Sequence, residues 1–231
     1  MQSLFSNRYS IRASCGPDSS IRASLVVALL CWFKPIAAEN ELPPLEAIDR
    51  DLDLEKFSGD WFVIASIPVK IPFFNDSDAY NYTESYEILD EGVIRMTCAF
   101  NVGGFDGKRK SVSFKAFSED LQANTEWGVQ FVWPFRAKYT VIYLDDDYQT
   151  VIVGVPNRRW AWIMKRDTKI SEQRYSELLT ILEDAGFDTD KVKRVPHDDA
   201  GTADVISRAA KSPGSSYARA SAQSRHQTRS P

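Results

Sequence analysis

Residues 138–166 have the sequence KYTVIYLDDDYQTVIVGVPNRRWAWIMKR, and this stretch decides the fold class. Three runs rich in Val, Ile, Tyr and Trp are separated by short polar turns at 145–147 and 156–159. β-branched and aromatic residues favour strands, and such short connections favour antiparallel neighbours. In the last run Trp160 and Trp162 alternate with other side chains, so one face of that strand is aromatic. The stretch therefore predicts three consecutive antiparallel strands.

The same pattern continues on the N-terminal side of this stretch. Five earlier runs of strand-forming residues lie at 61–67, 80–89, 93–100, 110–117 and 125–133. Eight sequential antiparallel strands favour closure, because a closed barrel has no exposed edge strand. The sequence therefore predicts an all-β fold, an eight-stranded antiparallel up-and-down β-barrel.

A single helix is predicted after the last strand. Ser171 is a suitable N-cap, and Gly186 is a suitable terminator. The apolar residues at spacing i, i+3, i+4 and i+7 are Tyr175, Leu178, Leu179 and Leu182. Such a stripe must be buried, so we expect this C-terminal α-helix to pack outside the barrel.

Charge is unevenly distributed along the 231 residues, although the net charge is only −4. Residues 1–38 carry four basic and one acidic side chain, and residues 198–231 carry five basic and three acidic ones. The part between them is therefore acidic, with a net charge of −9. We expect a linker at 39–49, one globular domain at 50–197, and a disordered tail at 198–231, which has too few apolar residues to fold.

The N-terminal segment resembles an export signal. Arginines precede an apolar run at 23–33, and small residues follow it, as signal peptidase requires. We expect a signal peptide at 1–38 and an exported protein. Lipid anchoring at Cys31 is an alternative, but Leu30 stands where lipoprotein processing needs a small residue. Cleavage would leave Cys98 alone, without an internal disulfide.

Three separated motifs carry a family resemblance. Gly59-Asp60-Trp61 opens the first strand, residues 144–148 form an acidic turn before a Tyr, and Arg166 ends the eighth strand. In this order and spacing they resemble the lipocalins, most closely the bacterial outer-membrane lipocalins and their apolipoprotein D-like relatives. The resemblance spans roughly 50–196. It implies a binder of fatty acids or lysophospholipids that works at the cell envelope, in the periplasm or outer membrane of a bacterium.

The topology brings these motifs together without reference to the family. In an up-and-down meander, alternate connections lie at opposite ends, so the three motifs must meet at one end. We expect them to close that end by cation–π contact and charge-assisted hydrogen bonds. The expected closed-end residues are Gly59, Trp61, Asp145, Tyr148 and Arg166.

The opposite, open end is expected to be cationic. Its connections carry five more basic than acidic side chains; the basic ones are Lys70, Lys108, Arg109, Lys110, Arg136, Lys138, Arg158 and Arg159. The first of these connections also contains Phe73 and Phe74, which we expect to be exposed. An apolar interior beneath a cationic rim suits an anionic amphiphile.

Period-two alternation gives the candidate ligand-binding residues. Those expected to face the interior are Val63, Tyr86, Phe114, Val129, Phe131, Tyr139, Val141, Trp160 and Trp162. Arg136 and Arg159 are expected at the rim, where a carboxylate or phosphate would lie. For each interior residue, core filling is as good an explanation as ligand contact.

The sequence gives little support to catalysis or metal binding. Both histidines, His197 and His226, follow the barrel, so no His-based triad or metal site is expected inside it, and no cofactor is expected. Glu84, Glu87 and Tyr86 could form an acid–base pair if Glu84 faced inward, but we expect surface positions for the two glutamates. Cys98 is expected to be a small strand residue.

We therefore expect a protein that carries or stores small hydrophobic or amphiphilic ligands, such as fatty acids or lysophospholipids. The expected state is a monomer or homodimer that could associate with membrane surfaces. An acidic exported domain is a poor nucleic-acid binder. Two alternatives stay open: an enzyme of the lipocalin fold acting on a lipid or carotenoid, and a protein-interaction module that uses the Phe73-Phe74 loop and the basic tail.

Overall fold

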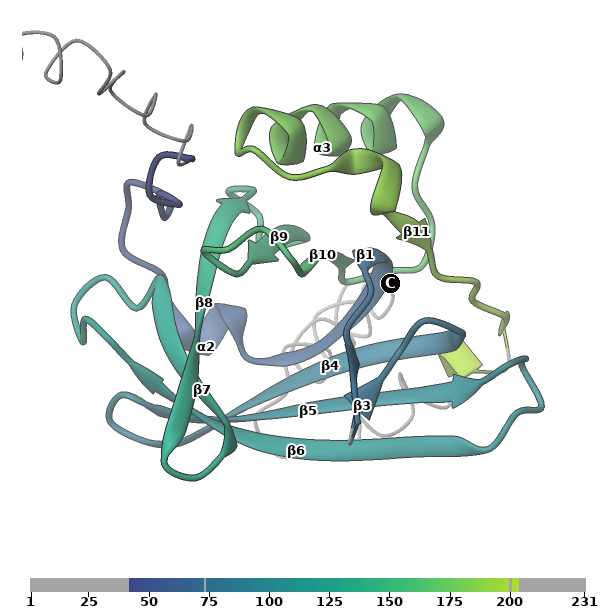
Figure 1. Ribbon diagram of the computed structural model, residues 1–231, viewed down its shortest axis with the longest axis horizontal. Helices are drawn as coiled ribbons and strands as arrows, with labels where there is room; N and C mark the ends of the chain where they lie inside the picture. Colours follow the sequence, from purple (N-terminus) through teal and green to yellow (C-terminus); the bar gives the residue numbers. More distant parts are fainter. Residues whose placement is uncertain (1–41, 73, 200, 204–231) are drawn as a thin grey trace, which may run out of the picture. The chain divides into compact units, whose positions relative to one another are not determined.

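The computed structural model describes residues 42–72, 74–199 and 201–203 (Figure 1). Its barrel strands are β1 (Gly59–Ile67), β4 (Ala79–Asp90), β5 (Val93–Val102), β6 (Arg109–Ser118), β7 (Glu126–Val132), β8 (Phe135–Leu144), β9 (Thr150–Gly154) and β10 (Ala161–Lys165). Each strand pairs antiparallel with the next one in this series, and β10 pairs with β1, which closes the barrel. The predicted fold class and all eight predicted strands are confirmed.

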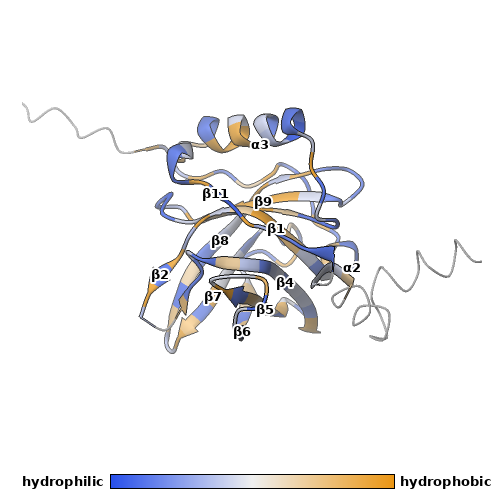
Figure 2. Cartoon of the chain, turned by 90° about the vertical axis from the view of Figure 1, so that its right-hand side faces the viewer, coloured by the Kyte–Doolittle hydropathy of each residue, from blue (hydrophilic) through white to orange (hydrophobic). Residues whose placement is uncertain are grey.

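The helix α3 (Glu172–Asp184) lies outside the barrel, as predicted. The Ser171 side chain caps it by accepting a hydrogen bond from the Arg174 N–H. Leu178 and Leu182 are buried in an outer apolar cluster together with Ile152 of β9 and further residues of β1 and β10. Figure 2 shows hydrophobic residues on both α3 and β9, which lie next to each other.

The segment after α3 completes the barrel wall. It forms the short 3-10 helix η1 (Thr189–Lys191) and the strand β11 (Lys193–Arg194), which pairs with β1. Residues 59–62 of β1 pair with residues 83–86 of β4, and beyond this point the two strands do not pair. β11 and the residues that follow it fill the gap between them. Asn81 of β4 donates its N–H to the Pro196 carbonyl, and Asp198 exchanges hydrogen bonds with the Asn81 side chain. Asp198 therefore lies against the barrel, one residue beyond the expected boundary at 197.

The second half of the expected linker at 39–49 is packed against the barrel. Leu45 is buried in the outer cluster beside α3. The Ile48 N–H donates to the Val141 carbonyl at 2.9 Å, and its side chain packs against the interior. This segment therefore packs on the barrel because its apolar residues find complementary surface there. The expected signal peptide, Cys31 and the tail beyond 203 lie outside the described residues.

Two short elements at the ends of the barrel were not predicted. The helix α2 (Leu54–Phe57) precedes β1 at the closed end, and Asp53 caps it. The strands β2 (Lys70–Ile71) and β3 (Phe74–Asn75) form a hairpin within the connection from β1 to β4, at the open end. Within the described residues, no helix combines the length and the hydropathy needed to span a bilayer.

Candidate ligand-binding site

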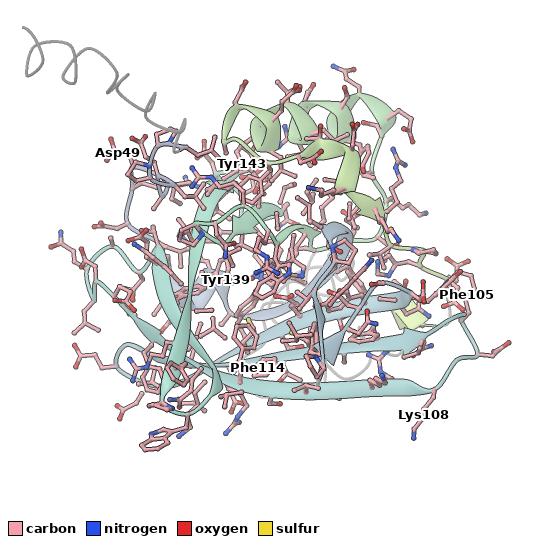
Figure 3. The ribbon with its side chains drawn as sticks, in the orientation of Figure 1. Asp49, Phe105, Lys108, Phe114, Tyr139 and Tyr143 are labelled. Carbon is pink, nitrogen blue, oxygen red and sulfur yellow. The ribbon has the colours of Figure 1, made fainter. Side chains whose placement is uncertain are left out.

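The barrel interior is lined by one continuous apolar cluster. It contains all nine residues that alternation predicted to face inward: Val63, Tyr86, Phe114, Val129, Phe131, Tyr139, Val141, Trp160 and Trp162. Phe131 and Trp160 are partly buried, and the other seven are buried. In Figure 3, Phe114 and Tyr139 come from opposite walls, β6 and β8, into this interior. The tertiary structure therefore brings the predicted set together.

Arg166 and Trp61 pack together at the closed end. The guanidinium carbon of Arg166 lies 3.8 Å from the Trp61 ring centroid. The guanidinium donates hydrogen bonds to the carbonyls of Lys56 at 2.7 Å and Asp60 at 2.8 Å. The Trp61 indole N–H donates to the Phe57 carbonyl at 2.8 Å. The pair therefore ties β10 to the α2 turn and the start of β1.

The acidic turn between β8 and β9 is stabilised by hydrogen bonds within the turn, and it also contacts the N-terminus of α2. The Asp145 carboxylate accepts hydrogen bonds from the N–H groups of Gln149 at 2.6 Å and Thr150 at 3.0 Å. Tyr148 has a φ of 56°, and its hydroxyl accepts from the Asp53 N–H at 3.0 Å. Gly59 has a φ of 91°, which an L side chain rarely adopts.

Phe57 of α2 plugs the closed end from inside, a role that sequence reasoning missed. Its side chain is only 1% exposed. Its ring centroid lies 5.4 Å from Trp61, 4.9 Å from Tyr86 and 5.3 Å from Trp127. The available signal was an apolar residue two positions before the Gly of the Gly-x-Trp motif.

At the open end the structure corrects the expectation of an exposed Phe73-Phe74 loop. Phe74 is 5% exposed, and its ring centroid lies 5.7 Å from Phe100 and 6.2 Å from Phe114. Phe73 lies outside the described residues. The hairpin between β7 and β8 exposes aromatic side chains instead, with Trp133 81% and Phe135 76% exposed.

Lys110 and Arg159 are the basic residues placed beside the interior at this end. Lys110 alternates with Phe114 on the interior side of β6 and pairs with Phe100 of the interior cluster. The Arg159 guanidinium lies 5.7 Å from the Trp160 ring centroid. Both side chains are exposed, as a rim position requires.

Three of the other expected rim cations, Arg136, Lys138 and Arg158, have partners elsewhere. The Arg136 guanidinium lies 3.7 Å from the Phe117 ring centroid, on the outer face of the wall, so its expected rim position is corrected. Lys138 pairs with Glu126 at 2.8 Å, and Arg158 donates to the carbonyls of Pro43 and Ala185. Lys108 points away from the barrel in Figure 3.

Glu84 faces the interior, contrary to the expectation of a surface position. It is 1% exposed, and its carboxylate accepts hydrogen bonds from the hydroxyls of Tyr82 at 3.2 Å, Tyr86 at 2.6 Å and Tyr139 at 3.1 Å. Burial raises the pKa of Glu84, and the three tyrosine hydroxyls oppose that rise. Glu84 alternates along β4 in step with Tyr82 and Tyr86, and this was the available signal for an inward orientation. The polar character of the Glu84 side chain argued for the surface.

A second carboxyl group, Asp76, lies between β3 and β4. It is 3% exposed, and its Oδ1 accepts a hydrogen bond from the Val69 N–H at 2.7 Å. Burial raises the pKa of Asp76 to about 7, and the nearby Glu84 adds to the rise. The Cys98 thiol is also buried, and burial raises its pKa, so the unreactive thiol form is favoured. Among the described residues, no three His, Cys, Asp or Glu side chains gather in a way that could hold a metal ion.

Comparison with known proteins finds similar sequences and similar solved structures. Temperature-induced lipocalin-1 of Arabidopsis thaliana is 27% identical over 158 residues, 65% of this chain and 82% of the relative. Outer membrane lipoprotein Blc of Escherichia coli K12 is 26% identical over 171 residues, 72% of this chain and 92% of the relative. Among solved structures, lobster apocrustacyanin A1 has 12% identity and a TM-score of 0.47, over 63% of this chain and 79% of its own. The cockroach allergen Per a 4 has 15% identity and a TM-score of 0.48, over 68% and 96%.

The family model described as a lipocalin-like domain matches residues 52–197, which include the whole barrel, α3 and β11. This range contains the Trp61–Arg166 pair, the acidic turn and every interior residue described above. The chain therefore belongs to the lipocalin-like family.

Proposed function

We propose that this protein binds and carries fatty acids or lysophospholipids in the cell envelope. Members of its family generally bind small hydrophobic ligands. The observation that carries the proposal is the continuous apolar lining of a barrel that is closed at one end. Each methylene transferred from water into such a lining contributes about 0.8 kcal/mol, so a long acyl chain would supply most of the affinity.

The rim supports an anionic head group. Lys110 and Arg159 lie beside the interior at the open end, where they could bind a carboxylate or phosphate. The buried carboxyl groups Asp76 and Glu84 disfavour an anion deeper inside. The acyl chain would therefore point inward and the head group outward.

The location in the envelope and at membrane surfaces is supported by two observations. One relative is named an outer membrane lipoprotein. The hairpin between β7 and β8 exposes Val132, Trp133 and Phe135, and aromatic side chains of this kind favour the membrane–water interface. The basic residues Arg136 and Lys138 follow them and would attract anionic lipids.

Two measurements test the proposal. The native protein should retain bound lipid during purification, so mass spectrometry of the purified protein should find acyl lipids. Lys110→Glu should weaken binding of palmitate about tenfold and leave binding of neutral hexadecan-1-ol nearly unchanged. Lys115→Glu is the control, because Lys115 lies on the outer face of the same strand. Absence of saturable binding of any lipid to the native protein would contradict the carrier function.

A lipid-modifying enzyme is the second candidate, favoured by the polar groups inside the barrel. Glu84, three tyrosine hydroxyls and Asp76 are titratable groups that converge there. The Glu84 carboxylate is hydrogen-bonded to three tyrosine hydroxyls and to the Cys98 thiol, which suits a structural role. Incubation with the co-purified lipid, followed by mass spectrometry, separates the two: a carrier returns the lipid unchanged.

A further inference from the structure

The barrel wall has a seam between β1 and β4, and the segment after β11 closes it. The two strands stop pairing after the first four residues of β1. Residues 195–198, which we call the latch, bind the two strands alternately. The Val195 N–H donates to the Ile64 carbonyl of β1 at 2.9 Å, and the Pro196 carbonyl accepts from the Asn81 N–H of β4 at 2.9 Å. The latch therefore replaces direct pairing of β1 with β4, and its course beyond β11 can be followed in Figure 1.

The next two residues of the latch continue the alternation through their side chains. Nε2 of His197 lies 2.9 Å from the Val63 carbonyl of β1. The His197 ring also packs edge-on against Phe62, with 5.6 Å between the ring centroids. Asp198 exchanges two hydrogen bonds of 3.0 Å with the Asn81 side chain of β4. His197 is therefore the side chain that holds the latch on β1.

The latch also covers the barrel interior. Val195 is partly buried against the interior apolar cluster. The ladders that β1 forms with β10 and that β4 forms with β5 do not involve the latch. Release of the latch would therefore expose the interior between β1 and β4 while the eight barrel strands stay paired as they are.

The protonation state of His197 follows from its partners. A carbonyl oxygen only accepts, so Nε2 carries the proton and donates it to Val63. Nδ1 is buried and has no hydrogen-bond partner in the described part of the chain. A proton on Nδ1 would create a buried charge without an acceptor, so the closed latch favours the neutral ring. Burial accordingly lowers the pKa of His197, although the hydrogen bond to Val63 and the charge of Asp198 oppose this fall.

The charged groups around the latch do not offer Nδ1 an acceptor. The Asp198 carboxylate is engaged by the Asn81 side chain and, at 2.6 Å, by the Gly201 N–H. Glu84 of β4 faces the interior. The remaining charged side chains on neighbouring elements are Lys165 of β10, which pairs with Asp167, Arg194 of β11, which pairs with Glu172, Arg109 of β6, which donates to the Asn81 carbonyl, and Lys193 of β11.

We propose that the latch is an acid-sensitive closure of the barrel wall, in which protonation of His197 at Nδ1 releases residues 195–198 from β1 and opens the interior between β1 and β4. In the released latch the ring has the ordinary histidine pKa of 6.5, and in the closed latch the pKa is lower. The closed latch is therefore fully stable above about pH 7.5 and loses stability as the pH falls through 6.5. A further consequence, which rests on the proposed carrier function, is that acidification speeds the exit of a bound lipid.

Hydrogen exchange of the full chain tests the latch directly. The amides of Val195 and Asn81 donate across the seam. Their protection, corrected for the pH dependence of intrinsic exchange, should fall about tenfold between pH 7.5 and pH 5.5, the limit for a group with the ordinary histidine pKa in the released state. Amides of the β4–β5 ladder should keep their protection, since that ladder does not depend on the latch.

His197→Gln is the diagnostic variant, because glutamine keeps an N–H donor for the Val63 carbonyl and does not titrate. Its Val195 and Asn81 amides should show the same protection at both pH values. His226→Gln is the matched control, since it replaces the other histidine of the chain and should behave like the native protein. Circular dichroism at both pH values checks that the variants are folded. The comparison of latch and ladder amides in the native protein needs no variant.

Three exchange results would overturn the proposal. They are constant protection of the latch amides in the native protein, an equal loss in His197→Gln, and a loss spread over the whole barrel, which would indicate global unfolding. Asp76 cannot produce the expected loss, although its pKa of about 7 lies in the same range. Its raised pKa stabilises the folded protein as the pH falls, which is the opposite sign.

Stopped-flow release of a naturally fluorescent polyene fatty acid tests the exit route. Release from the native protein should be up to tenfold faster at pH 5.5 than at pH 7.5, and release from His197→Gln should not accelerate. Equal rates for the two proteins at pH 5.5 would overturn the exit route. Failure of the fatty acid to bind at all would instead contradict the carrier function, and the exchange result would still decide on the latch.

Discussion

The guanidinium carbon of Arg166 lies 3.8 Å from the ring centroid of Trp61, although the two residues are 105 positions apart in the sequence. The same guanidinium donates to the carbonyls of Lys56, Phe57 and Ser58. One side chain therefore provides both a cation–π contact and several hydrogen bonds to otherwise buried carbonyls. It joins the first and last strands of the barrel at the end where the interior is closed.

Truncation of Trp61 should destabilise the protein strongly. Trp61→Ala removes a fully buried ring and the Phe57 hydrogen bond, so we expect a loss of about 3–5 kcal/mol in the free energy of unfolding. Urea denaturation followed by circular dichroism measures it. The control is Trp133→Ala, at a position 81% exposed, which should stay within about 0.5 kcal/mol of the native protein. An unchanged unfolding midpoint for Trp61→Ala would show that the pair does not hold the closed end.

Arg166→Lys should destabilise the protein although it keeps the charge. Lysine cannot reproduce the planar fork that stacks on Trp61 and reaches several carbonyls, so we expect a loss of about 2 kcal/mol. Arg95→Lys serves as the control, because Arg95 forms a surface ion pair with Glu87 and its loss costs little. Equal stability of the two variants would leave the structural role of Arg166 without support.

Asp76 should make stability depend on pH. Its pKa in the folded state is about 7, against 3.8 for an ordinary aspartate, so folding favours the protonated form. Its contribution is therefore fully present below pH about 4 and is lost as the pH rises through 7. Asp76→Asn cannot ionise, so its stability relative to the native protein should increase between pH 4 and pH 8, by at most about 4 kcal/mol. Unfolding in urea at both pH values measures this change, and a constant difference would contradict the raised pKa.

Phe74 should keep the open end covered. Phe74→Ala removes ring contacts with Phe100 and Phe114, so we expect a loss of about 3 kcal/mol in stability and faster dissociation of a bound fatty acid. Stopped-flow displacement of a fluorescent fatty acid measures the rate. The control is Phe105→Ala, since Phe105 is 39% exposed and its ring contacts Tyr80. A dissociation rate equal to that of the native protein would show that Phe74 does not limit release.

The exposed β7–β8 hairpin should mediate membrane association. Replacing Trp133 and Phe135 together by Ser should reduce co-sedimentation with vesicles of anionic phospholipid several-fold, because the aromatic rings would no longer enter the interface. The unfolding midpoint should change little, since both side chains are largely exposed. Undiminished co-sedimentation would assign membrane association, if present, to another part of the chain.

The predicted strands were accurate because their signals are local. Each run at 138–144, 148–155 and 160–166 contains its own alternation and ends at its own turn. The short elements α2 and the β2–β3 hairpin have no comparable periodicity. Their form depends on surfaces at the two ends of a barrel that exist only after the strands have paired.

The inward orientation of side chains was predicted well where residues are apolar and poorly where they are polar. All nine interior residues belong to the interior cluster, because period-two alternation follows from strand geometry. Glu84 was assigned to the surface although it alternates with Tyr86, since a carboxyl group needs partners to be buried. One of those partners, Tyr139, is 55 positions away in the sequence.

The sequence by itself determined the eight-stranded barrel, the outer helix and the convergence of three motifs at one end, because these follow from periodicity and strand order. The tertiary structure decided how polar groups are placed. It moved Arg136 to the outer wall over Phe117, buried Phe74, and buried the carboxyl group of Asp76 beside the Trp162 side chain. The physical reason is that burial of a polar group depends on partners that distant strands supply, and no local pattern encodes those partners.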